Sequence, residues 1–218
     1  WLLHYMRASC AHPVSLLYLL LTDSNLRKMT GTEEPAETVE AEIVTPTPTP
    51  EGNGRKIAID AGHQAHGNSE QEPIGPGASQ TKAKVASGTT GRTTGVTEYQ
   101  LNLDVSLKLQ QILEDRGYQT VLTRTDNDTA ISNKERAEYV AGQGADVYVR
   151  IHANGAESSS AAGALTISPS SSNPYVSQLY DDSNSLSQCI LDAYCDATGF
   201  ENRGVTYADN MTGINWST

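Results

Sequence analysis

Cysteine is scarce in this chain, and its scarcity excludes two kinds of protein. Three of the 218 residues are cysteines, and no two of them form a CxxC pair. Three are too few for a disulfide framework, and their spacing excludes a zinc site built from cysteines. Cys189 and Cys195 are six residues apart in a stretch with helical character, which places them about 240° apart around a helix axis. We therefore predict that they do not form a disulfide.

Basic clusters and long apolar runs are also lacking. The net charge is −11 and the 15 Lys and Arg residues are scattered, so nucleic acid is not an expected partner, because phosphate binding needs a high density of these residues. The apolar run from Pro13 to Leu21 is about nine residues long, whereas a membrane-spanning helix needs roughly 20. We expect no stable membrane span. With Arg7 before it, the run fits either the apolar region of a signal peptide or a leader without a function.

Composition divides the chain into three parts. Residues 30–54 are acidic, rich in Thr and Pro, and free of aromatic residues, and such a stretch cannot bury enough apolar surface to fold. We predict a disordered linker there, after a leader of uncertain origin over residues 1–29 and before one folded domain over residues 55–218. We expect residues 1–54 to pack little against that domain.

Strands alternate with helices in the predicted domain. Apolar, β-rich segments predict strands over residues 56–60, 118–124, 146–152 and 163–168, and periodic segments predict helices over residues 98–115, 132–141 and 185–197. A long loop fills residues 64–96, and loops of that length are usually functional or mobile. The alternation predicts the α/β class, with an open, mostly parallel twisted sheet flanked by helices.

Two helix starts carry the capping-box pattern. Thr97 is followed by Gln100, and Ser132 is followed by Glu135, so each pair can satisfy free backbone N–H groups in the first turn. The first helix also carries an apolar stripe that we expect to face the core. The stripe consists of Leu101, Val105, Leu109 and Ile112.

Three side chains are candidates for a metal site. His63 follows the first predicted strand, and His152 ends the strand over residues 146–152. Because ligands bind beyond the carboxyl ends of strands in open α/β sheets, the two histidines can be neighbours. Glu98 lies three residues before Leu101 and shares the buried face of its helix, where a lone carboxylate is costly. Two imidazoles and one carboxylate are the ligands of a three-residue catalytic zinc site.

Each of these residues also has an ordinary structural explanation. A histidine at a strand end often only makes hydrogen bonds, and Glu98 in a first helical turn can simply complement the helix dipole. His66 competes with His63 for the same role, three residues further along the loop. His4 and His12 lie in the leader and are not candidates. From the residues alone, the metal site and the structural explanation both stay open.

Four short motifs resemble the catalytic domain of the zinc-dependent N-acetylmuramoyl-L-alanine amidases, which hydrolyse bacterial peptidoglycan. They are IDAGHQ at 59–64, the stretch from Glu98 to Leu103, the TR pair at 123–124, and RIHANG at 150–155. They stand in the family's order across about residues 55–218. In that family the metal is held by the His of the DAGH turn, the Glu that opens the helix and the His of the IHAN strand. The resemblance therefore implies that His63, Glu98 and His152 hold the metal here.

The chain departs from the family pattern at two places. Gln64 replaces the small glycine that often follows the first histidine. The family also carries a catalytic Glu on a strand after a segment like GINWS, and here Thr218 directly follows that segment at 213–217. The resemblance implies that the last strand and helix are missing, that the catalytic residue is unassigned, and that the activity of this chain is impaired. Glu70 or Glu72, in the long loop, is the alternative source of a base.

The implied function is zinc-assisted hydrolysis of the amide bond between N-acetylmuramic acid and L-alanine. It implies Zn²⁺ as the cofactor, peptidoglycan as the partner, and an extracytoplasmic location in bacteria, either secreted or in the cell envelope. Asp60 or Asn154 is expected to orient the metal ligands from behind, as zinc sites usually require. Two alternatives remain: a non-catalytic zinc or wall-binding remnant, and a zinc peptidase of other specificity.

Overall fold

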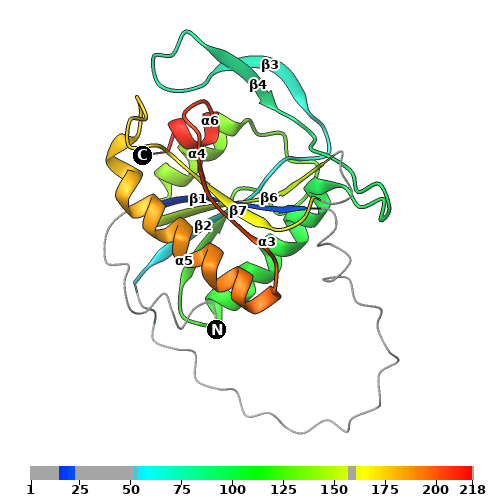
Figure 1. The fold of residues 1–218 in the computed structure, drawn as a ribbon. Coiled ribbons are helices and arrows are strands. Elements are labelled where there is room, and N and C mark those ends of the chain that lie inside the picture. The colour runs from blue at the N-terminus through cyan, green and yellow to red at the C-terminus, as the bar shows by residue number, and fades with distance from the viewer. Residues whose placement is uncertain (1–14, 23–51, 53, 157–160, 218) are drawn as a thin grey trace, which may run out of the picture.

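The computed structural model describes residues 15–22, 52, 54–156 and 161–217, and it is built around a six-stranded sheet (Figure 1). The strand order is β5-β2-β6-β1-β7-β8. The bounds are β1 Ser15–Thr22, β2 Lys56–Ala61, β5 Gln119–Leu122, β6 Val147–Asn154, β7 Ala164–Ser168 and β8 Asn202–Tyr207. All neighbouring pairs are parallel except β1 and β7. The predicted α/β class with a mostly parallel sheet is confirmed.

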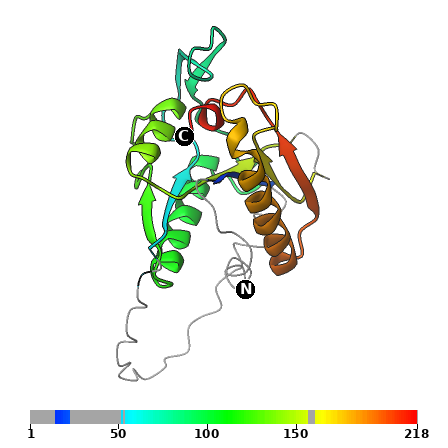
Figure 2. The same cartoon turned by 90° about the vertical axis from the view of Figure 1, so that its left-hand side faces the viewer.

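Helices cover both faces of the sheet. Helices α3 (Glu98–Glu114) and α5 (Tyr180–Thr198) lie on one face, whereas α4 (Asn133–Gly142) and the short α6 (Thr212–Asn215) lie on the other. A 3-10 turn, η1 (Ser177–Leu179), leads into α5. Figure 2 shows the two long helices from the side, α3 in green and α5 in orange. None of the helices in the described residues is both long and apolar enough to cross a membrane.

Strand β2 shows how the sheet separates the two cores. Its side chains alternate between the faces, so Ile57 and Ile59 pack in the cluster that contains Leu113 of α3, while Ala58 packs with Ala137 of α4. All three β2 residues are almost fully buried. The strand therefore fixes the position of the turn that follows it, and this turn carries His63.

Strand β1 was not expected, because it lies in the segment that the sequence analysis assigned to a leader. Ser15–Thr22 pairs with β6 over its whole length and with β7 over four residues. Its sequence, SLLYLLLT, is nearly continuously apolar, which is common in strands of parallel sheets. The expectation that residues 1–54 pack little against the domain is therefore wrong for these eight residues. The rest of the predicted leader and nearly all of the predicted linker over residues 30–54 lie outside the described part of the chain.

The long loop predicted over residues 64–96 contains a second, smaller sheet. Strands β3 (Asn68–Pro73) and β4 (Thr81–Val85) form an antiparallel hairpin. Both views show the hairpin projecting beyond the body of the molecule (Figures 1 and 2). The turn end of the hairpin is held by Trp216, whose Nε1 donates a hydrogen bond to the carbonyl of Pro73, the last residue of β3 (2.9 Å).

The structure confirms one of the two predicted helix caps and only part of the predicted apolar stripe. The capping box of Ser132 and Glu135 is present at the start of α4. Thr97 is the N-cap of α3, but its side chain makes no capping hydrogen bond. Within the predicted stripe of α3, Leu101 is buried whereas Ile112 is 45% exposed, and Leu113 takes the buried position instead. Cys189 and Cys195 do not form a disulfide with each other, as predicted.

Candidate metal centre

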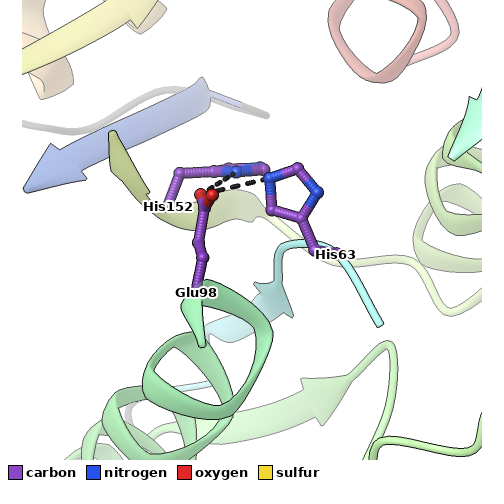
Figure 3. Close-up of side chains that lie close together, drawn as sticks. All are labelled: His63, Glu98 and His152. Carbon is purple, nitrogen blue, oxygen red and sulfur yellow. Dashed lines mark hydrogen bonds and ion pairs between the residues drawn. The ribbon is translucent and has the colours of Figure 1, made fainter. Parts of the chain in front are cut away.

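His63, Glu98 and His152 converge from three separate elements. Oε1 of Glu98 lies 3.1 Å from Nε2 of His63 and 3.2 Å from Nδ1 of His152. One ligand atom from each residue can be chosen so that all three lie within 4.8 Å of one another. Figure 3 shows the two rings and the carboxylate pointing toward one another, with Glu98 rising from the first turn of α3. The expected convergence at the carboxyl ends of β2 and β6 is confirmed.

His63 is held by a turn and by a carbonyl on the opposite loop. Its backbone φ is 64°, and among the described residues it is the one non-glycine residue with a positive φ. Its Nδ1 lies 2.8 Å from the carbonyl oxygen of Ala86. Because a carbonyl only accepts, Nδ1 donates this hydrogen bond, and Nε2 is the ring nitrogen that faces Glu98. This arrangement prepares Nε2 for a metal.

Glu98 is kept as a carboxylate. Burial alone would raise the pKa of Glu98, but the hydrogen bonds that Glu98 makes with His152 and His63 outweigh burial and hold that pKa well below its usual range. Backbone N–H groups add to this, since Thr89 donates to Oε2 and Ala153 donates to Oε1, each at 3.1 Å. The anion is thus fixed in place at the start of α3.

His152 is neutral at physiological pH. Burial lowers the pKa of His152 to about 4, with smaller contributions in the same direction from the charges of His63 and Arg150. The close approach of the chain at Gly62 adds a steric restraint, because a Cβ there would lie 2.7 Å from Nδ1 of His152 and nearer still to Cε1 and Nε2. Two imidazoles and one carboxylate form a donor set that suits zinc.

The three side chains line a cavity of about 720 Å³. Its walls come from the loop after β4, the start of α3, the end of β6 and single residues of β7 and the segment before α6. They include Ala86, Gly88, Thr90, Arg92, Val96, Leu101, Asn154, Gly155, Ile167 and Met211. Among the described residues that line it, Glu98 is the only carboxylate, and Arg92 is the only side chain with a fixed positive charge.

The alternative candidates for a base or a metal ligand lie outside the cavity lining. Glu70 is exposed and pairs with Lys84 (2.7 Å), while Glu72 is buried and accepts a hydrogen bond from the backbone N–H of Lys134 at the start of α4 (3.1 Å). Neither lines the cavity, so the suggestion that one of them supplies a base there is not supported. The side chain of His66 does not line it either. Asn154, one of the two residues expected to orient the metal ligands, lines the cavity.

Asp60, the other residue expected behind the ligands, is the centre of a buried ionic network. Arg136 contacts its Oδ1 and Arg150 contacts its Oδ2, both at 2.6 Å, and the hydroxyls of Thr123 and Tyr148 also donate to it. Burial alone would raise the pKa of Asp60, but the two arginines and the Thr123 hydrogen bond hold it far below its usual range. The sequence analysis missed Arg136, because no local pattern relates it to a turn more than 70 residues away.

Comparison with known proteins decides the family. The sequence model of the Amidase_3 family, described as N-acetylmuramoyl-L-alanine amidase, matches residues 57–218. The chain belongs to this family. Among curated members, N-acetylmuramoyl-L-alanine amidase LytC of Bacillus subtilis (strain 168) is 31% identical over 157 residues. The match covers 71% of this chain but 26% of LytC, so the chain spans about a quarter of the length of that relative.

Solved amidase structures share the fold. The N-acetylmuramoyl-L-alanine amidase of Clostridium difficile 630 superposes with a TM-score of 0.56 at 27% identity, covering 77% of this chain and 76% of the other. The catalytic domain of CwlV, an amidase from Bacillus (Paenibacillus) polymyxa var. colistinus, superposes with a TM-score of 0.52 at 26% identity, covering 75% of both chains. This Amidase_3 member therefore has the α/β architecture of amidase catalytic domains.

Proposed function

We propose that this chain is a zinc-dependent N-acetylmuramoyl-L-alanine amidase domain that acts on peptidoglycan. The proposed reaction is hydrolysis of the amide bond between N-acetylmuramic acid and L-alanine. The observation that carries the proposal is the convergence of His63, Glu98 and His152 at the floor of a cavity, in a chain that belongs to this family. Peptidoglycan as substrate also implies an extracytoplasmic location.

The chemistry of the donor set supports zinc as the metal. His63 would bind through Nε2, His152 through Nδ1 and Glu98 through its carboxylate, since these are the atoms that face one another. A set of three protein ligands leaves a position open for substrate, as catalytic zinc sites require. Zinc bound there would supply Lewis acidity toward the amide carbonyl.

The remaining residues of the cavity would bind and orient the substrate. The wall formed by Gly88, Thr89 and Thr90 offers small side chains and backbone groups beside the metal ligands, and Asn154, at the end of β6, offers an amide. Arg92 carries the one fixed positive charge among the described lining residues. A cavity of this size with polar groups beside the metal ligands can accommodate a glycan-linked peptide.

The rate of hydrolysis that we expect depends on whether the cavity holds a general base or acid. Glu98 is committed to two imidazoles and two backbone N–H groups, and no second carboxylate lines the cavity among the described residues. A positioned general base or acid typically contributes about 10²–10⁴-fold. We therefore expect slow, zinc-dependent turnover by this chain. The same observation favours the second candidate, a domain that binds zinc and wall material without hydrolysing it.

The test is an assay of the full 218-residue chain on purified peptidoglycan, with and without zinc. Newly exposed L-alanine amino groups are measured, and Glu98→Gln serves as the matched variant. The proposal predicts a slow release that requires both zinc and Glu98. Release from free stem peptides but not from intact peptidoglycan would indicate a zinc peptidase. Sedimentation with the wall without any release would indicate the non-catalytic alternative.

A further inference from the structure

We infer that Arg136 is a positioning residue for the metal site, because its guanidinium holds the turn that presents His63. The inference rests on the proposed zinc site. Arg136 lies in α4, on the face of the sheet opposite to α3, and its side chain is completely buried. It does not line the cavity, so any effect on the metal must pass through another residue.

The contacts of Arg136 fall on the turn after β2. Its Nη1 donates to Oδ1 of Asp60 (2.6 Å) and to the carbonyl of Ala61 (2.9 Å). Its Nη2 donates to the carbonyl of His63 (3.0 Å) and to Oε1 of Gln64 (2.9 Å). One rigid, planar group thus ties together four of the five residues from Asp60 to Gln64, a geometry that the single ammonium of a lysine cannot reproduce.

The turn needs such a restraint because His63 adopts an unfavourable backbone conformation. Its φ of 64° lies in the left-handed region, which only a few per cent of non-glycine residues occupy. Residues in this region persist where the surroundings hold them, and they cluster at functional sites. The bond from Arg136 to the carbonyl of His63 restrains the residue whose conformation is unusual.

A second arginine supports the turn from another side, but it does not reach His63. Arg124 donates through Nε to the carbonyl of Ala61 (2.8 Å) and through Nη2 to the carbonyl of Gly62 (3.2 Å). Burial and the neighbouring charge of Arg136 lower the pKa of Arg124 to about 10, so it remains charged at neutral pH. The two arginines together satisfy the carbonyls of Ala61, Gly62 and His63, and Arg136 alone of the pair binds the ligand residue.

Loss of the hydrogen bond from Arg136 to the His63 carbonyl would change the direction of the His63 imidazole and so weaken metal binding. Release of its carbonyl allows φ to relax toward the common negative range, and this rotation swings the imidazole away from Glu98. Metal–ligand distances tolerate only about 0.2 Å. The substitution of a residue behind the metal ligands typically weakens metal affinity by about 10- to 100-fold.

The test uses the full chain with Arg136→Lys and Arg136→Met. Zinc affinity is measured by competition with a chromophoric chelator, and the visible spectrum of bound Co²⁺ reports the ligand geometry. Thr123→Val is the matched control, because Thr123 donates to the same Oδ1 of Asp60 (2.5 Å) without a hydrogen bond to the turn carbonyls. Thermal unfolding of each variant shows whether it is folded at the assay temperature. If Arg136→Met does not fold, Arg136→Lys decides, since it retains a cation beside Asp60.

A second background separates positioning from general destabilisation. His63→Asn removes the imidazole, and asparagine tolerates the left-handed conformation. We expect Arg136→Lys to weaken zinc binding at least about 10-fold in the native background, to change the Co²⁺ spectrum, and to have no further effect in the His63→Asn background. Thr123→Val should leave the affinity within about threefold of native.

Two results would overturn the inference. One is a folded Arg136→Lys variant with native zinc affinity. The other is an equal loss with and without the His63 imidazole, because the residue would then act on the whole domain rather than through His63. A native chain that binds no zinc would instead overturn the proposed function, and the inference with it.

Discussion

Gly62→Ala tests how tightly the metal site is built, because this substitution adds one methyl group against a metal ligand. A Cβ at position 62 would lie 2.3 Å from Cε1 and 2.4 Å from Nε2 of His152, whereas ordinary van der Waals contact begins near 3.4 Å, so the imidazole must retreat by about 1 Å. That shift exceeds the tolerance of about 0.2 Å for zinc ligation. We expect zinc affinity to fall at least about 100-fold, with a loss of about 1–3 kcal/mol in folding stability from overpacking.

The assay is chelator competition for zinc, combined with urea unfolding of the metal-free proteins. Gly142→Ala is the matched control, because position 142 ends α4 and nothing lies within 4 Å of a Cβ there. It should leave zinc binding unchanged and stabilise the helix slightly. Native zinc affinity in a folded Gly62→Ala variant would refute the reasoning, because the ring of His152 would then have to bind metal in a position that the structure does not show.

Three further predictions concern stability. Ser132→Ala removes the capping hydrogen bond to Glu135 and should lower the free energy of unfolding in urea by about 1 kcal/mol. Thr97→Ala loses no capping hydrogen bond and should lower it clearly less. Equal losses would contradict the assigned caps. Deletion of residues 1–22 removes β1 from between β6 and β7 and should lower the thermal midpoint by at least about 10 °C, so an unchanged midpoint would show that β1 is not part of the fold. Folding lowers the pKa of His152 from 6.5 to about 4. Between these two pH values, the unfolded metal-free chain therefore binds a proton at His152 that the folded chain does not bind. Its stability should therefore fall as pH falls from 6.5 to 4. His152→Gln should flatten that dependence, and an identical slope in both proteins would contradict the assignment.

Much of the fold was readable from local patterns. Strand β2 and helix α4 appeared near their predicted positions, because an apolar run and a complete capping box are signals that a few neighbouring residues specify. Strand β1 was missed because its apolar sequence fits a leader equally well, and only its pairing with β6 and β7 shows the difference. The β3–β4 hairpin was missed because its strands are polar and largely exposed, so they lack the hydrophobic alternation that predicts a strand.

The sequence predicted the three candidate metal ligands but not the groups that hold them in place. His63 and His152 follow buried strands, and Glu98 opens an apolar helix, so each stands out by position. The groups behind them carry no such signal. The carbonyl of Ala86 that orients His63 is a backbone atom of a loop, and Arg136 reaches its turn from a helix on the other face of the sheet. These contacts depend on how the elements pack, and packing over such sequence separations is not written in any local pattern.

The most direct test of the metal site is the zinc content of the purified chain after equilibrium dialysis at pH 7. We expect one zinc per native chain. We expect none above background in a variant that carries His63→Asn, Glu98→Gln and His152→Gln together, because these substitutions remove every ligand of the group. Near-ultraviolet circular dichroism would verify that the variant is folded. A native chain without zinc, or a folded triple variant that retains it, would contradict the central claim that these three side chains form the metal site.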